Sequence, residues 1–156
     1  MADTRLLQDI RAEEAVVAAI LLDDREVVTE GVTTLLTPEM FVDGPCRAAY
    51  RAFLSLRERK ADTTIVTVIR EWIERGWIDA VDRETGGVGA EPWLADVVGK
   101  HWTASGVEAH ARIIRDLYER RTQFQQAQVM AREAFTGPVL APPVYSRPEY
   151  AQAEGF

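Results

Sequence analysis

The stretch Glu84–Trp93, "ETGGVGAEPW", has the residue types that come nearest to a phosphate-binding loop. It places Gly86, Gly87 and Gly89 within four positions, and glycines let backbone N–H groups approach a phosphate closely. A Walker A loop also needs a Lys-Ser/Thr pair, and a dinucleotide-binding loop needs a third glycine where Pro92 stands. The acidic "DAVDRE" before the glycines would also repel phosphate. The sequence therefore predicts a turn between two helices.

The other reactive residue types stand alone in the sequence. His101 and His110 have no partners at the spacing of a metal site or a general base, and we expect His110 to pack on the buried side of a helix. Cys46 lies on an apolar helix stripe, which is typical of a small packed residue. Arg57, Arg59 and Lys60 could contact a phosphate, although cations at a helix C-terminus also complement its dipole. The sequence predicts no catalytic residue, no cofactor and no metal site.

Length and composition are those of one globular domain. The chain has 156 residues, of which 47% are hydrophobic and 28% charged, and a single cysteine excludes an internal disulfide. No apolar run approaches the roughly 20 residues that cross a bilayer. The net charge of −7 argues against DNA binding by electrostatics alone. We expect a cytoplasmic protein that does not bind membranes.

Apolar residues recur every three or four positions, which predicts helices throughout. The segment 62–76, "DTTIVTVIREWIERG", starts with β-branched residues that favour a strand, but its apolar spacing and the terminal Gly76 favour a helix. The last helix should begin with a capping box of Ser105 and Glu108 and continue to about Phe135. The predicted fold is all-α, a compact bundle of about six helices with a long C-terminal helix.

Two further helices are expected before residue 37. The first covers residues 4–22, with its N-cap at Asp3 or Thr4, and the second runs to about Leu36. We assign residues 1–136 to the helical domain. Residues 137–156 contain four of the seven prolines and are predicted to be a linker or a disordered tail.

The last helix changes character midway. Its first half carries a core-facing apolar stripe, whereas "TQFQQAQVMAREAF" keeps only sparse apolar positions. A helix that extends beyond its own core is exposed or packs on another chain. We expect Phe124, Val129 and Met130 to form a helix–helix contact. Trp93 and Leu94 are further candidates for a surface that faces a partner.

Six segments, in this order, carry a resemblance to one family. They are "RAEEAVVAAILLDD", "LLTPEMF", "CRAAYRAFLSL", "ADTTIVTVIREWIERG", "GGVGAEPWL" and "SGVEAHARIIRDLYERR". Together they resemble the N-terminal domain of the DnaB-type bacterial replicative DNA helicases, over roughly residues 10–136. Trp93 stands at the aromatic position of the family's Gly-Gly turn.

The resemblance implies a non-catalytic all-α domain whose last helix is the first arm of a helical hairpin. In that family the domain forms the collar of a hexameric ring and docks primase, while ATP hydrolysis belongs to a separate RecA-like domain. The implied partners are a second copy of the chain, and primase, a replicative helicase or a helicase loader. DNA would be contacted only indirectly.

Several alternatives remain open at this point. The chain could be a domain of a longer helicase, or a stand-alone mimic of the collar that recruits or inhibits a helicase. An enzyme of unrecognised fold is a further possibility. Direct DNA binding by the last helix would use its arginines, Arg112, Arg115, Arg120, Arg121 and Arg132.

Overall fold

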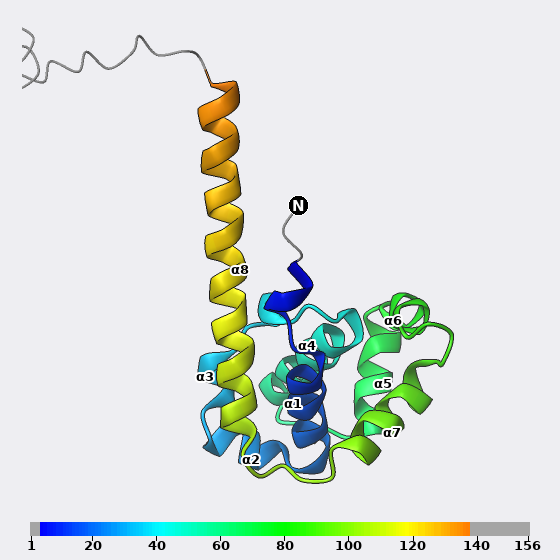
Figure 1. Cartoon of the computed structure of the whole chain (residues 1–156). Helices are drawn as coiled ribbons and strands as arrows, with labels where there is room; N and C mark the ends of the chain where they lie inside the picture. The colour runs from blue at the N-terminus through cyan, green and yellow to red at the C-terminus, as the bar shows by residue number, and fades with distance from the viewer. Residues whose placement is uncertain (1–3, 138–156) are drawn as a thin grey trace, which may run out of the picture. The chain divides into compact units, whose positions relative to one another are not determined.

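The computed structural model describes residues 4–137 (Figure 1). The chain divides into two units, one up to Thr122 and one from Gln123, and each is described by itself. The described residues form eight α-helices and two short 3₁₀ helices, without any strand. The predicted all-α class is therefore confirmed, with more and shorter helices than the six expected.

The helices follow one another through short loops. The 3₁₀ helices are η1 (Thr4–Leu7) and η2 (Pro38–Met40). The α-helices are α1 (Ile10–Leu22), α2 (Asp24–Thr29), α3 (Val32–Leu35), α4 (Gly44–Glu58), α5 (Ile65–Glu74), α6 (Ile78–Glu84), α7 (Ala90–Lys100) and α8 (Val107–Thr136).

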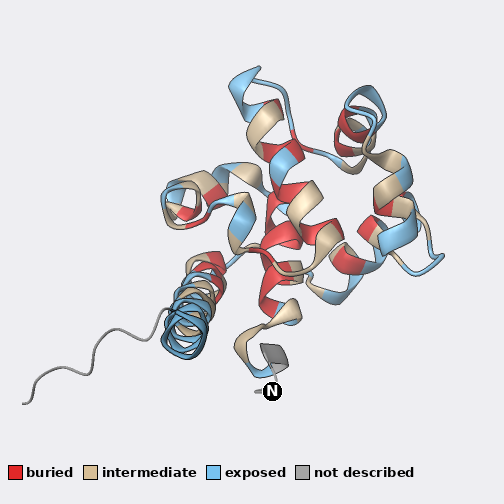
Figure 2. Cartoon of the chain, turned by 90° about the horizontal axis from the view of Figure 1, so that it is seen from above, coloured by how far each residue is buried: buried red, intermediate tan, exposed pale blue. Residues whose placement is uncertain are grey.

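Helix α1 lies at the centre of the first unit and contacts α2, α4 and α7. Its residues from Ala15 to Ile20 are all buried, so this helix is apolar all round rather than on one face. Five of those six residues are alanine or valine, which lets the surrounding helices approach closely. Figure 2 shows the buried residues gathered where the helices of this unit face one another.

Aromatic side chains fill the space between α1, α4 and α5. The ring of Tyr50 contacts those of both Phe41 and Phe53. Its centroid lies 4.9 Å from that of Phe41 and 5.9 Å from that of Phe53, and both pairs are tilted. The Tyr50 hydroxyl donates to the carbonyl of Leu36 at 2.9 Å, and burial raises the pKa of Tyr50 to about 12. The indole N–H of Trp72 donates to the carbonyl of Ala48, so the buried polar atoms of these rings are satisfied.

The ambiguous segment 62–76 is a helix, as predicted. Thr64 caps α5, because its hydroxyl accepts the Thr67 N–H at 3.2 Å and the Thr67 hydroxyl accepts the Thr64 N–H at 2.8 Å. This reciprocal cap satisfies two backbone donors at the helix start. Gly76 ends the helix with a φ of +71°, which a glycine adopts without strain.

The helices before residue 37 differ from the prediction. The first α-helix starts at Ile10, after the separate 3₁₀ turn η1, because the Asp9 carboxylate accepts the Ala12 N–H. The expected second helix is divided into α2 and α3 by Gly31, whose φ is +73°. A left-handed residue cannot continue a right-handed helix, so the chain turns there.

Helix α8 is long, as predicted, but its capping box is absent. Ser105 donates its N–H to Thr103, and the N–H of Glu108 is accepted by the carboxylate of Glu30. In the first unit, α8 buries Val107, Ala111 and Ile114. Helix α8 ends at Thr136; the assignment of residues 1–136 to one domain stays a prediction, and the prediction for residues 138–156 lies outside the described residues.

Candidate interaction surfaces

The glycine cluster forms the predicted turn between α6 and α7. All three of its glycines have positive φ, between +69° and +94°. The Thr85 hydroxyl accepts the Gly89 N–H at 2.9 Å, and the Asp82 carboxylate accepts the Ala90 N–H at 2.8 Å. These acceptors engage backbone donors that a phosphate would need, and Asp82 adds negative charge at the same place. The turn is built to position α7.

The isolated reactive residues have structural roles in the first unit. The Nε2 atom of His101 lies 3.5 Å from the Glu14 carboxylate, and His110 is half-buried on α8 rather than fully packed. Cys46 is buried, and burial, followed by the charge of Asp43, raises the pKa of its thiol. Within residues 4–137, no cluster of His, Cys, Asp and Glu has the geometry of a metal site.

The second unit carries the three residues predicted to form a helix–helix contact. Phe124 is half-buried, whereas Val129 is 52% and Met130 69% exposed. An α-helix turns by roughly 100° per residue, which places Val129 roughly 140° and Met130 roughly 240° from Phe124 around the axis. The three side chains therefore do not share one face, and the helix does not bring them together as a single contact.

A different set of residues in this unit does share a face. Phe124 and Phe135 are about three turns apart on the same side of α8, with Ala127 and Ala131 between them. Phe135 is 92% exposed. We call these four residues the phenylalanine stripe. The predicted contact did not include Phe135, although its spacing of eleven residues from Phe124 was visible in the sequence.

The two residues of α7 that were predicted to face a partner differ in their burial. Leu94 is fully buried, at 0% exposure, and faces the core together with Ala90 and Val97. Because α7 packs against both α1 and α5, the face that carries Leu94 is covered within the chain. The prediction that Leu94 faces a partner is therefore wrong. Trp93 is half-buried and stays a candidate.

Helix α5 exposes two apolar residues of the first unit. Val66 and Ile73 are two turns apart on one side of α5, and both are exposed. The buried side holds Val68 and Trp72 together with Glu71. Apolar residues occur around more of the α5 circumference than the part that packs against the core. Their spacing alone therefore does not separate the buried side from the exposed side.

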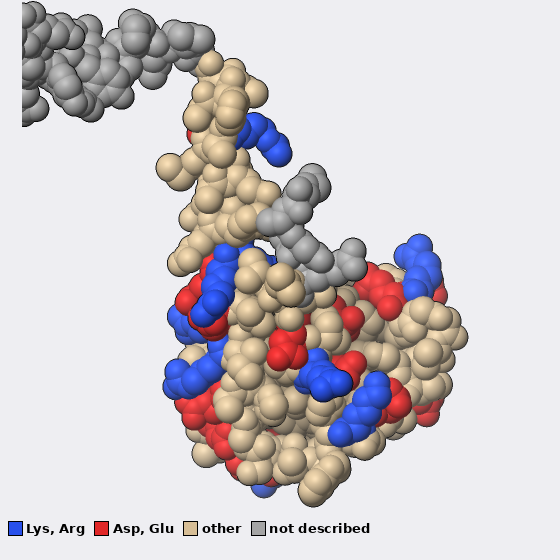
Figure 3. All heavy atoms as spheres, viewed as in Figure 1, with Lys and Arg blue, Asp and Glu red and all other residues tan. Residues whose placement is uncertain are grey.

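Most arginines of α8 are already engaged within the chain. Arg112, Arg115 and Arg120 form ion pairs with carboxylates one turn away, at 2.6, 3.2 and 3.0 Å. Arg121 donates to the carbonyls of Leu7 and Met40. Figure 3 shows acidic and basic side chains intermixed over the visible face of the first unit rather than a basic patch. This arrangement disfavours the DNA-binding alternative.

The order and packing of these helices agree with a known domain family. The family model described as the DnaB-like helicase N terminal domain matches residues 5–116, well over half of the chain. The chain belongs to this family. The resemblance that the six sequence segments indicated is thereby confirmed, and the chain is connected with DNA replication.

Relatives of this DnaB-like domain are replicative helicases. The chain is 31% identical to the replicative DNA helicase DnaB of Geobacillus stearothermophilus over 129 residues, which are 83% of this chain and 26% of that protein. It is 29% identical to the DnaB of Rhodothermus marinus over 73% of this chain and 11% of that protein. The chain thus spans about a quarter or less of these relatives.

A solved structure shares the fold of this DnaB-like domain. The crystal structure of the N-terminal domain of DnaB helicase from Mycobacterium tuberculosis superposes with a TM-score of 0.74 at 25% identity, covering 94% of this chain and 95% of that one. The family match ends at residue 116, before the phenylalanine stripe begins. None of the described helices combines the length and apolar content needed to cross a bilayer.

Proposed function

We propose that this chain is a non-catalytic interaction module of DNA replication, which associates with a second copy of itself through the phenylalanine stripe of α8. The observation that carries this proposal is the exposure of Phe135 on the same face as Phe124. A helix with an apolar stripe and no covering partner is unfavourable in water, because the exposed aromatic surface is not removed from solvent. Pairing two such stripes would bury it.

Composition along the second unit supports association rather than nucleic-acid binding. Gln123, Gln125, Gln126 and Gln128 surround the start of the stripe with uncharged polar side chains. Neutral flanks impose little repulsion between two identical helices, whereas charged flanks of one sign would oppose their approach. Ala127 and Ala131 between the two rings would let the helix axes come close.

Sedimentation velocity of the full chain tests the proposal. The wild type should sediment as a dimer or a larger oligomer, and F124A/F135A should shift the equilibrium toward monomer by tenfold or more, since each ring would contribute roughly 1–2 kcal/mol to association. The matched control is V129A/M130A, which removes similar apolar area from other sides of the same helix.

The control decides between the stripe and a general effect of hydrophobicity. We expect V129A/M130A to sediment like the wild type, and circular dichroism should show both variants folded. A wild type that is monomeric at all concentrations, or equal weakening by both pairs of substitutions, would contradict the proposal.

We further propose that the first unit docks a replication protein, namely primase, a replicative helicase or a helicase loader. The half-buried Trp93 on α7 and the exposed Val66 and Ile73 on α5 are the apolar positions that support this. The proposal applies equally to a collar domain within a helicase and to a separate collar mimic. Light scattering of the chain alone, of purified primase alone and of their mixture tests it, since a docked complex has a larger mass than either protein by itself.

A further inference from the structure

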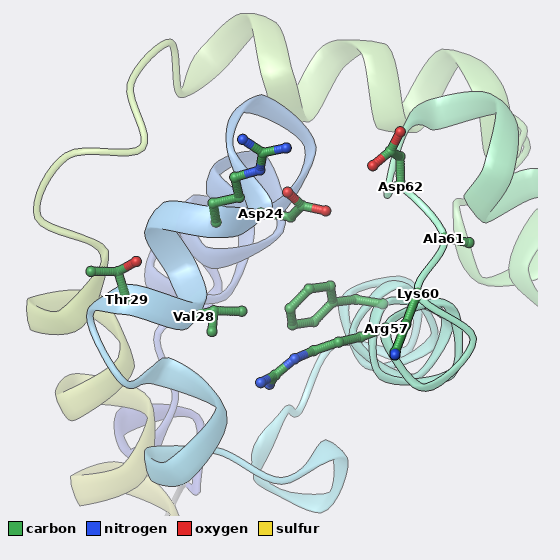
Figure 4. A pocket seen from close by; sticks show the side chains of 9 residues that line it. Asp24, Val28, Thr29, Arg57, Lys60, Ala61 and Asp62 are labelled. Atoms are coloured by element: carbon green, nitrogen blue, oxygen red, sulfur yellow. The ribbon is translucent and has the colours of Figure 1, made fainter.

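The first unit contains an open hollow of about 420 Å³ between α2, the end of α4 and the segment that follows it (Figure 4). Its apolar lining includes Phe53, Val28 and Ala61, and three cations line it as well. A hollow of this volume accommodates a few side chains but not a helix, whose diameter is roughly 10 Å. It shares no lining residue with the glycine turn.

The cations come from different parts of the chain and form no ion pair with the part of the chain that the structure describes. Arg25 belongs to α2, Arg57 to the last turn of α4, and Lys60 follows that helix. Among the described residues, no carboxylate lies within ion-pair distance of any of the three. In Figure 4, Arg57 extends across the hollow toward Val28 of α2. Within residues 4–137, the site therefore offers three positive charges that are not held in ion pairs.

Lys60 has an unusual backbone conformation for its residue type. Its φ is +57°, and it is the single non-glycine residue with positive φ in the described part of the chain. It closes α4, because the N–H of Ala61 bonds to the carbonyl of Leu56 at 2.9 Å, an arrangement in which glycine is the usual residue. A lysine at this place is less stable than a glycine. Residues with a strained backbone cluster at functional sites, which suggests a functional role for the Lys60 side chain.

The acidic residues of the hollow restrict the kind of anion. Asp24 and Asp62 also line it, and Figure 4 shows both on the side away from Arg57. On that side the two carboxylates would repel a phosphate or another carboxylate, but they can accept the backbone N–H groups of a peptide. The guanidinium of Arg57 can bind a side-chain carboxylate in bidentate fashion, with Lys60 as a second charge.

We propose that this hollow binds an acidic, extended peptide segment of a partner protein. One or two carboxylates of the segment would lie against Arg57 and Lys60, and their aliphatic stems would cover Val28 and Ala61. Asp24 already accepts the Thr63 N–H at 3.4 Å, which keeps it on its side of the hollow. The inference rests on the proposed docking role of the first unit and is independent of self-association by α8.

Fluorescence anisotropy of the full chain with a labelled hexaglutamate peptide tests the inference. We expect saturable one-site binding that hexaglutamine does not show. R57Q should weaken it tenfold or more. K60G should weaken it about fivefold while raising the melting temperature, because glycine relieves the strain at this position. R83Q is the matched control, since Arg83 is an exposed arginine of α6 that does not line the hollow.

Three results would overturn the inference. One is the absence of saturable binding, and another is equal weakening by R83Q and R57Q, which would indicate diffuse attraction. The third is displacement of the peptide by inorganic phosphate or by hexathymidylate at concentrations comparable with hexaglutamate, which would assign the hollow to phosphates. Sedimentation of R57Q and K60G should equal that of the wild type, so a failure of this inference is distinguishable from a failure of self-association.

Discussion

The carboxylate of Glu30 accepts a hydrogen bond of 2.9 Å from the backbone N–H of Glu108, although 78 positions separate the two residues. Glu30 ends α2, and Glu108 lies in the first turn of α8. An anion at this place satisfies a free backbone donor and interacts favourably with the positive end of the helix dipole. The start of the longest helix is thus held by a side chain of another element.

Removal of this tertiary cap should destabilise the first unit. We expect E30A to lower the free energy of unfolding by about 1 kcal/mol, as for the loss of an N-cap. Urea denaturation followed by circular dichroism measures the change. S105A is the control, and it should have little effect, because the Ser105 side chain does not cap α8 in this structure. An equal loss of unfolding free energy in both variants would contradict the tertiary cap and support the local capping box predicted from the sequence.

Glu13 should make the protein less stable as the pH rises. It is buried on α1 and accepts the Asp43 N–H at 3.0 Å. Burial raises its pKa from 4.5 to about 7, and the bond from Asp43 offsets this only in part. A folded pKa above the unfolded one gives stability that is complete below pH 4.5 and lost as the pH rises to about 7.

The E13Q variant isolates this effect, because an amide oxygen can still accept the Asp43 N–H. Near pH 4.5 we expect little difference between E13Q and the wild type. At pH 8 E13Q should be more stable, by at most about 3 kcal/mol. Chemical denaturation at both pH values provides the comparison, and E133Q, a change of an exposed carboxylate in the second unit, should show no such difference.

Glu71 should have the opposite pH dependence. It accepts bonds from Ser55 at 2.7 Å and from Arg75 at 3.0 Å, and it also pairs with Arg59. Burial raises its pKa, but the bonds from Ser55 and Arg75 and the two positive charges outweigh burial, so the net pKa lies below 4.5. Its contribution to stability is therefore present above pH 4.5 and lost as the pH falls through the lower folded pKa.

At neutral pH, E71Q should lower the free energy of unfolding by about 2 kcal/mol, because it leaves charged donors with a weaker acceptor. E74Q provides the comparison, since Glu74 is an exposed residue that pairs with Arg59 at 3.8 Å, and its change should be below about 0.5 kcal/mol. The difference between the two variants should shrink in acid. A difference that stays constant throughout the acid titration would show that the acceptor's charge is not what matters.

Leu94 should behave as a core residue rather than as a contact residue. We expect L94A to lower the free energy of unfolding by about 3 kcal/mol, because it leaves a cavity under α7. V88A, at an exposed position in the preceding turn, should change it by less than about 0.5 kcal/mol. Thermal melts of both variants decide this, and a stable L94A protein would contradict the burial of this side chain.

Helix type and turns were predictable from the sequence because they depend on residues close together in the chain. The spacing of apolar residues predicted the helix of 65–74 despite its β-branched start, and the three glycines predicted the turn before α7. The family could be predicted as well, because six short segments occur in one order. Helix α6 and the division at Gly31 were missed, because both involve only one or two turns of helix.

The sequence by itself thus determined that this chain is a helical domain of the DnaB-like family with a long last helix. Only the tertiary structure decided which residues of each helix are covered: it buried Leu94, exposed Val66, and placed Glu30 at the start of α8. The physical reason is the range of the interactions. Helix formation is set by residues within four positions of one another, whereas burial and tertiary caps depend on elements that are distant in the chain.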